Sequence, residues 1–211
     1  MISHQTETAA KDKPENGIKR KYQLILNHEQ DFALSLAAEM IYAPEKPRWM
    51  ALFPIVYFLH RYRVRNYERK LRDFSQNFLK TKILALDISL EEIRTGDSVE
   101  LSVEKCFPQV DSSMHKDVRL CEKQLAELMV LKDHYRRLFK PSGNNYLDLL
   151  KKAYRKEEDL KQFNSRLARA ESEINRYILK NYQKGKWSEP TVRQMENITA
   201  RLREQNIKGI F

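Results

Sequence analysis

Apolar side chains recur at alternating steps of four and three residues along the longest stretches of the chain. This spacing is typical of helices that pack lengthwise on one another, as in a coiled coil. One series runs through the centre of the chain and two more run through its second half. The central series is Phe53, Tyr57, His60, Val64, Tyr67, Leu71, Phe74 and Phe78. We therefore expect long helices that bury one face each.

Capping residues, prolines and a glycine divide these stretches into separate elements. Asn27 has the spacing of an N-cap, and Pro44 ends the helix that it opens. Pro54 lies where a second helix begins or bends. Ser89 resembles the N-cap of a further short helix, which Gly96 would end. Residues 99–107 fit a strand and a helix equally well, and with no strand partner we predict a helix.

The second half of the chain reads as a helical hairpin. A turn at 141–145 separates a helix that ends near Phe139 from a helix predicted over 146–182. The second helix is longer by about ten residues, so it should overhang by roughly 15 Å. Its apolar face there must meet another helix or another subunit. Ser188 and Pro190 open the last helix.

The pattern predicts an all-α fold, an elongated helical bundle with a long antiparallel helical hairpin. The chain contains only five glycines, which agrees with long helices and few tight turns. Three parts are expected. They are a disordered, basic tail over 1–26, a helical part over 27–110 that contains the apolar-basic central helix, and the hairpin with the C-terminal helix over 111–211.

Charge is distributed unevenly along the chain, which carries a net charge of +10. Residues 47–86 hold nine basic against two acidic side chains, and residues 87–111 hold two basic against seven acidic. A basic block favours polyanions such as nucleic acid or an anionic membrane. The acidic block beside it could fold back and neutralise part of that charge.

Motifs for catalysis, metal binding and cofactor binding are absent from the sequence. No histidine lies three or four residues from another histidine or a cysteine, and no glycine-rich loop could hold a phosphate. We therefore expect no enzyme activity, no metal and no cofactor. The N-terminus lacks the apolar segment of a signal peptide, which predicts a cytoplasmic protein.

The stretch from Pro47 to Arg72 is the strongest candidate for a functional surface. Its apolar run of 11 residues, Trp49 to Leu59, is too short to span a bilayer but long enough to enter its surface. The predicted membrane-binding or partner-binding residues are Trp49, Leu52, Phe53, Ile55, Val56, Phe58 and Leu59. The predicted polyanion-binding residues are Arg61, Arg63, Arg65, Arg69, Lys70 and Arg72.

Three functions compete for this stretch. Docking on the cytoplasmic face of a membrane, or on a membrane-bound partner, uses both the apolar run and the basic residues. Nucleic-acid binding would use the alternating arginines and tyrosines of 61–72. A purely structural protein would bury residues 49–59 in its core. We favour a non-enzymatic interaction protein that docks peripherally on an anionic membrane, with self-association through helices as a further expectation and nucleic acid as the weaker alternative.

Overall fold

The computed structural model describes residues 5–44, 54–101, 118–182 and 188–211, with side chains from residue 16 in the first range and from residue 60 in the second. Within these ranges every regular element is a helix. The helices are α1 (Gln5–Met40), α2 (Pro54–Thr95), α4 (Val118–Phe139), α5 (Tyr146–Ala153), α6 (Glu157–Asn181) and α7 (Glu189–Lys208). The prediction of an all-α bundle is confirmed.

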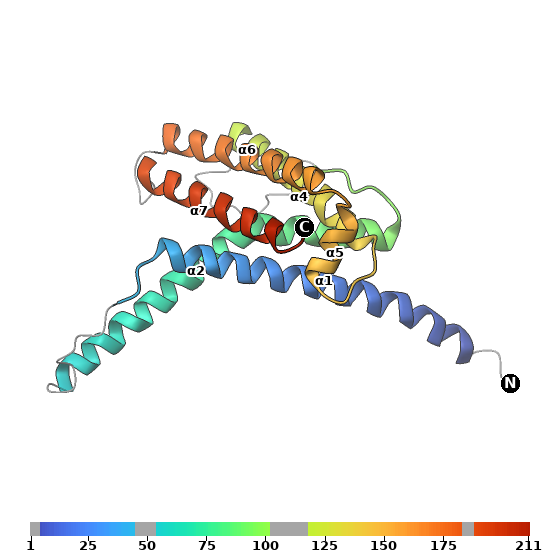
Figure 1. Ribbon diagram of the computed structural model, residues 1–211, viewed down its shortest axis with the longest axis horizontal. Helices are drawn as coiled ribbons and strands as arrows, with labels where there is room; N and C mark the ends of the chain where they lie inside the picture. Colours follow the sequence, from blue (N-terminus) through green and yellow to red (C-terminus); the bar gives the residue numbers. More distant parts are fainter. Residues whose placement is uncertain (1–4, 45–53, 102–117, 183–187) are drawn as a thin grey trace.

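Five of the helices enclose a common core. Helix α1 contacts α2, α4 and α7, α2 contacts α4, and α6 contacts α4 and α7. Figure 1 shows these helices gathered into one bundle. The short helix α5 contacts α1 and α4 at one end of the bundle. Leucines dominate the interior, and Leu128, Leu131, Leu138 and Leu149 are at most 1% exposed. Their burial in one apolar cluster supplies the main driving force for folding.

The prediction of a disordered tail over 1–26 is wrong for residues 5–26, which form the first part of α1. Ile25 is fully buried in the core, and Lys21 Nζ donates to the Phe139 carbonyl oxygen over 2.7 Å. The helix therefore starts well before Asn27, which lies inside it instead of capping it. The division into an N-terminal part and a hairpin part is not tested by these contacts and stays a prediction.

Helix α2 is longer than the pattern predicted, because Ser89 lies within it instead of starting a new helix. Its side chain is fully buried and donates to the carbonyl oxygens of Ala85, 2.7 Å away, and of Lys132, 3.1 Å away. Glu92, three residues after Ser89, accepts from Lys132 Nζ over 2.8 Å. The two residues thus join α2 to α4. Gly96 ends the helix as predicted, with a φ of 77°.

The second arm of the hairpin is broken where a continuous helix was predicted. Figure 1 shows α4 and α6 running in opposite directions side by side, with α5 preceding α6 as a separate element. Tyr154 ends α5 with a non-helical backbone and is 2% exposed. Three carboxylates then occupy the first turn of α6, where they interact favourably with the free amide groups of the helix.

The overhanging end of α6 meets another helix, as expected. Helix α7 covers it, so that Leu167 and Ile174 on α6 are 2% and 8% exposed. Ser188 caps α7, and its Oγ accepts from the Thr191 amide over 3.4 Å. The helix predicted over 99–107 is not present at 99–101, which carry no regular structure, and 102–107 lie outside the described residues.

Gly143 provides a test of the tight turn between α4 and α5. A methyl group added there would lie 2.9 Å from Leu149 Cδ2 and 3.1 Å from the Leu149 amide nitrogen. We expect Gly143→Ala to lower the free energy of unfolding by about 1–3 kcal/mol, as overpacking does. Gly17→Ala is the control, because α1 has open space there and alanine should stabilise the helix by about 0.5–1 kcal/mol. Urea denaturation followed by circular dichroism measures both, and effects of the same sign would contradict the packing described.

Candidate functional site

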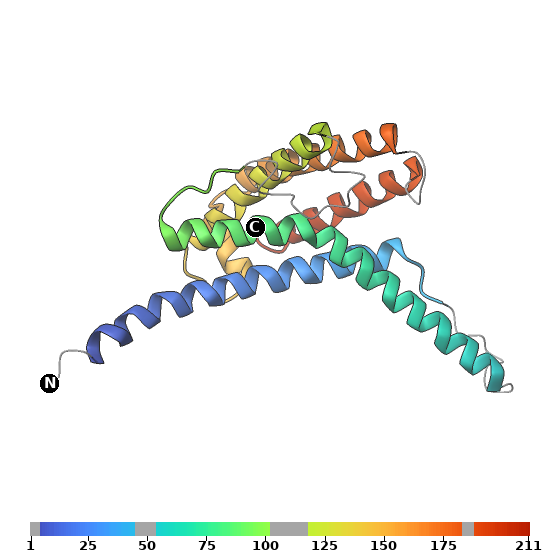
Figure 2. The same ribbon diagram turned by 180° about the vertical axis from the view of Figure 1, so that it is seen from behind.

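The N-terminal half of α2 extends away from the rest of the bundle. Figures 1 and 2 both show that α2 is bent and that its N-terminal half points away from α4, α6 and α7. Near the middle of the helix, Ser75 Oγ donates to the Leu71 carbonyl oxygen over 2.8 Å, a bond within the helix that favours bending. The same hydroxyl lies 3.3 Å from the Ala33 carbonyl oxygen of α1. We call residues 60–72 of α2 the basic arm.

All six predicted polyanion-binding residues lie exposed on the basic arm. Four of them, Arg61, Arg65, Arg69 and Arg72, are four, four and three residues apart and therefore share one face of the helix. Tyr62 beside them is 64% exposed. The exposed Arg63 and Lys70 are spaced to lie on another side of the helix.

The predicted apolar residues cannot be assessed in the same way. Trp49, Leu52 and Phe53 lie outside the described residues, and for Ile55, Val56, Phe58 and Leu59 only the helical backbone is described. Helical register still relates one of them to the basic face. Positions 58, 62, 65 and 69 are four, three and four residues apart and follow one line along α2.

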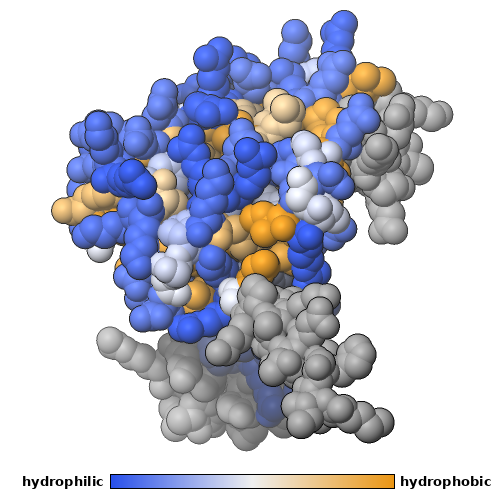
Figure 3. Space-filling model, turned by 90° about the vertical axis from the view of Figure 1, so that its right-hand side faces the viewer, coloured by the Kyte–Doolittle hydropathy of each residue, from blue (hydrophilic) through white to orange (hydrophobic). Residues whose placement is uncertain are grey.

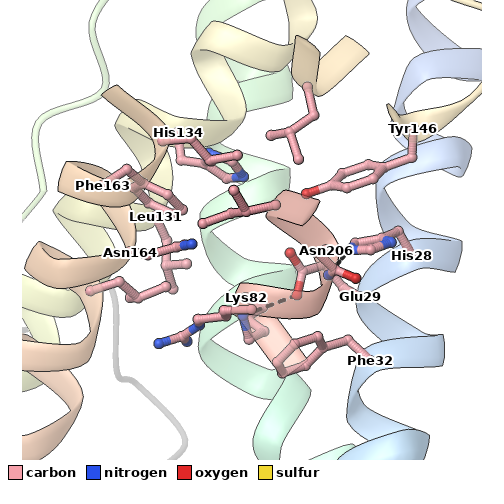
Figure 4. A pocket seen from close by; sticks show the side chains of 15 residues that line it. His28, Glu29, Phe32, Lys82, Leu131, His134, Tyr146, Phe163, Asn164 and Asn206 are labelled. Atoms are coloured by element: carbon pink, nitrogen blue, oxygen red, sulfur yellow. Dashed lines mark hydrogen bonds and ion pairs between the residues drawn. The ribbon is translucent and has the colours of Figure 1, made fainter. Parts of the chain in front are cut away.

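A second set of polar residues lies inside the bundle and was not predicted as a site. Glu29 on α1 and Lys82 on α2 form an ion pair, with Lys82 Nζ 3.0 Å from Glu29 Oε2 and side chains only 10% and 6% exposed (Figure 4). The lysine also lies 5.2 Å from the centre of the Phe78 ring. Burial alone would raise the pKa of Glu29, but the positive charge of Lys82 and its hydrogen bond to the carboxylate help to lower that pKa to about 2. Glu29 and Lys82 border a cavity of about 50 Å³.

A half-buried histidine, His28, and a buried one, His134, border the same cavity. His28 stacks on Tyr146 with ring centres 3.6 Å apart, and its Nε2 lies 3.4 Å from Asn206 Nδ2. His134 stacks on Phe163 at 4.0 Å, and its Nδ1 lies 2.7 Å from the Tyr154 hydroxyl. Burial lowers the pKa of His28 below its ordinary value and lowers that of His134 to about 3. Both rings are therefore neutral at physiological pH.

Beside this cavity lies a larger groove, lined by side chains of α2, α4, α6 and α7, with a volume of about 810 Å³. We call it the four-helix groove. Lys82, Asn164, Arg203 and Ile207 line both the groove and the small cavity. Arg203 is held by two hydrogen bonds to the Glu171 carboxylate, of 2.6 and 2.8 Å. The groove thus combines apolar walls with a few fixed polar groups, as ligand sites do.

A second basic cluster occupies the corner between α4 and α5. Arg137, Lys140, Lys152 and Arg155 surround a hollow of about 530 Å³ whose lining contains no acidic residue. Figure 3 views the end of the bundle that faces right in Figure 1, and hydrophilic side chains cover most of it, with apolar ones in separate small groups. Basic residues near the last turns of helices compensate the partial negative charge of the helix ends. The corner cluster therefore has a structural explanation.

Comparison with family models, curated proteins and solved structures found no match to this chain. Among the described residues, no group of histidine, cysteine and carboxylate side chains could hold a metal ion. No helix in this part of the chain is both long enough and apolar enough to cross a membrane.

The buried ion pair gives a sharp stability prediction. Lys82→Met leaves the Glu29 carboxylate buried without a partner, so the free energy of unfolding should fall by about 3–5 kcal/mol. The double variant Glu29→Met/Lys82→Met removes both charges and should recover most of that loss. Lys161→Met breaks the exposed pair with Glu157 and should cost less than about 1 kcal/mol. Urea denaturation of the four proteins tests this, and a double variant as unstable as the single one would refute it.

His134 predicts how stability depends on pH. An unfolded imidazole binds a proton below about pH 6.5, whereas folded His134 binds one only near pH 3. The unfolded state thus holds more protons between these values, and stability falls as the pH is lowered. Between pH 7 and pH 5 the parent should lose about 2 kcal/mol more than His134→Gln does. Denaturation curves at both pH values measure this difference, and equal losses would rule out a neutral, buried His134.

Proposed function

We propose that the chain is a non-enzymatic helical interaction protein that docks peripherally on an anionic membrane surface through the basic arm and the apolar run before it. The observation that carries the proposal is the arm itself, which extends from the bundle with its arginines exposed along one face. A helix end that projects from a core can reach a flat surface without a change in the bundle.

The charges of the arm support this proposal quantitatively. Residues 61–72 carry six basic side chains and one acidic side chain, Glu68. A basic residue close to an anionic leaflet contributes about 1 kcal/mol to binding. The four arginines on one face would together contribute about 4 kcal/mol, or roughly a thousandfold in affinity.

The order of residues along the helix favours a membrane over a nucleic acid. The apolar run 49–59 directly precedes the basic arm, and these two kinds of residue are the two signals that stable peripheral binding requires. Nucleic-acid binding would need exposed aromatic rings for stacking. Of the two tyrosines in 61–67, Tyr62 is exposed and Tyr67 is half-buried, which leaves one ring for such stacking.

Vesicle co-sedimentation tests the proposal. The parent should bind vesicles of phosphatidylcholine and phosphatidylserine, bind pure phosphatidylcholine vesicles much more weakly, and dissociate in about 1 M salt as the charges are screened. The variant Arg61→Gln/Arg65→Gln/Arg69→Gln/Arg72→Gln should bind the anionic vesicles about a thousandfold more weakly.

A matched control removes the same charge elsewhere. Arg119→Gln/Arg169→Gln/Arg176→Gln/Arg193→Gln changes four exposed arginines of α4, α6 and α7 and should lose much less affinity. A parent that stays in the supernatant with anionic vesicles at low salt would refute membrane docking. So would equal losses in the two variants. Binding of RNA or DNA that depends on the arm, without vesicle binding, would transfer the function to nucleic acids.

A further inference from the structure

The four-helix groove has an apolar wall and one unpaired carboxylate. Phe74 and Phe78 of α2, Ile174 of α6 and Met195 of α7 line the apolar part. Glu127 of α4 lines the groove as well, and it forms no hydrogen bond or ion pair with any residue that the structure describes. Glu127 is half-buried, so an ionised carboxylate there is less well solvated than one on an open surface and gains more from a bound cation.

The cations that line the groove already have partners. Lys82 is paired with Glu29, Lys161 with Glu157, and Arg203 with Glu171. Two carboxylates of the lining, Glu127 and Glu196, thus have no counterion among the described residues, and Glu196 accepts a hydrogen bond from Asn175 Nδ2 over 3.0 Å whereas Glu127 has no such partner. The chain as a whole is strongly basic, with a net charge of +10, so a groove with an uncompensated negative charge stands out.

The surroundings of Glu127 show the same imbalance. The charged groups that face it are Lys82 of α2, Glu171 of α6 and Arg203 of α7. Burial, followed by the negative charge of Glu171, raises the pKa of Glu127 to about 7, because the two cations compensate only part of the penalty. A bound cation within reach of the carboxylate would remove this penalty.

From this geometry we propose that the four-helix groove is a binding site for a small organic cation, an ammonium group on an apolar body, in which Glu127 pairs with the ammonium group. The apolar body would lie against Phe74 and Phe78. The groove volume of about 810 Å³ lies within the range of about 300–1,000 Å³ common to small-molecule sites. The site is separate from the basic arm, whose exposed charges attract anions.

Two ligands that differ in one group test the proposal by isothermal titration calorimetry. 2-(2-Naphthyl)ethylamine has the ammonium group and the aromatic body, and 2-(2-naphthyl)ethanol replaces the ammonium group by a hydroxyl. The parent should bind the amine about tenfold or more tightly than the alcohol at pH 8. Its affinity for the amine should fall by up to about tenfold between pH 8 and pH 6 as Glu127 takes up a proton.

Variants separate the carboxylate from the shape of the groove. Glu127→Gln should weaken the amine about tenfold or more, leave the alcohol unchanged and remove the pH dependence. Glu122→Gln, an exposed residue of α4 outside the groove lining, should change neither ligand. Ala168→Trp fills the groove and should weaken both ligands, whereas Ala126→Trp, outside the lining, should weaken neither. Circular dichroism melts confirm that each variant folds.

Three results would overturn the proposal. The first is no binding of the amine to the folded parent at about 1 mM, a concentration at which even weak ligands bind measurably. The second is equal affinity for the amine and the alcohol. The third is a Glu127→Gln variant that still prefers the amine, which would place the ammonium group elsewhere on the protein.

Discussion

The ion pair between Glu29 and Lys82 constrains the whole bundle. Both groups are buried, and a buried charge without a partner is far less stable than a buried pair. The pair forms only when α1 and α2 have one alignment along their shared face. That alignment also brings Ser75 to the Ala33 carbonyl oxygen and stacks Phe32 on Phe78, with ring centres 6.1 Å apart. The alignment of α1 with α2 is thus specified by a polar contact more precisely than by apolar side chains alone.

Helix α2 serves two surfaces of opposite character. Its N-terminal half carries exposed arginines away from the bundle, and its C-terminal half supplies Phe74, Phe78 and Lys82 to the four-helix groove. The charge of the chain is separated accordingly, with exposed positive charge on the arm and carboxylates without counterions, Glu127 and Glu196, in the lining of the groove. A membrane docking surface and a cation site can therefore coexist in one protein without competing for the same ligands.

The apolar pattern was enough to predict the fold class, because long four-three series with few glycines have no good alternative to helices. Breaks marked by special backbone chemistry, at Gly96 and Ser188, were also predictable. Ser89 was misread because a serine within a helix and a serine at its start share the same local sequence signal, and only the buried Lys132 carbonyl oxygen distinguishes them. The break after Tyr154 accompanies a buried contact of its hydroxyl with His134 on α4, which the local sequence does not show.

The two candidate sites also differ in how far the sequence predicts them. The basic arm is contiguous in sequence, so its arginines could be named from the pattern, and the structure adds that they are exposed. The groove is assembled from four helices, and Glu127 looks like an ordinary surface residue until its neighbours are known.

The contacts of Ser75 bear on the direction of the basic arm. This buried residue lies between the two halves of α2 and bonds both to its own helix and to α1, so the direction of the arm is encoded in the interior. Substitutions among the exposed arginines can therefore change the charge of the arm without changing its direction.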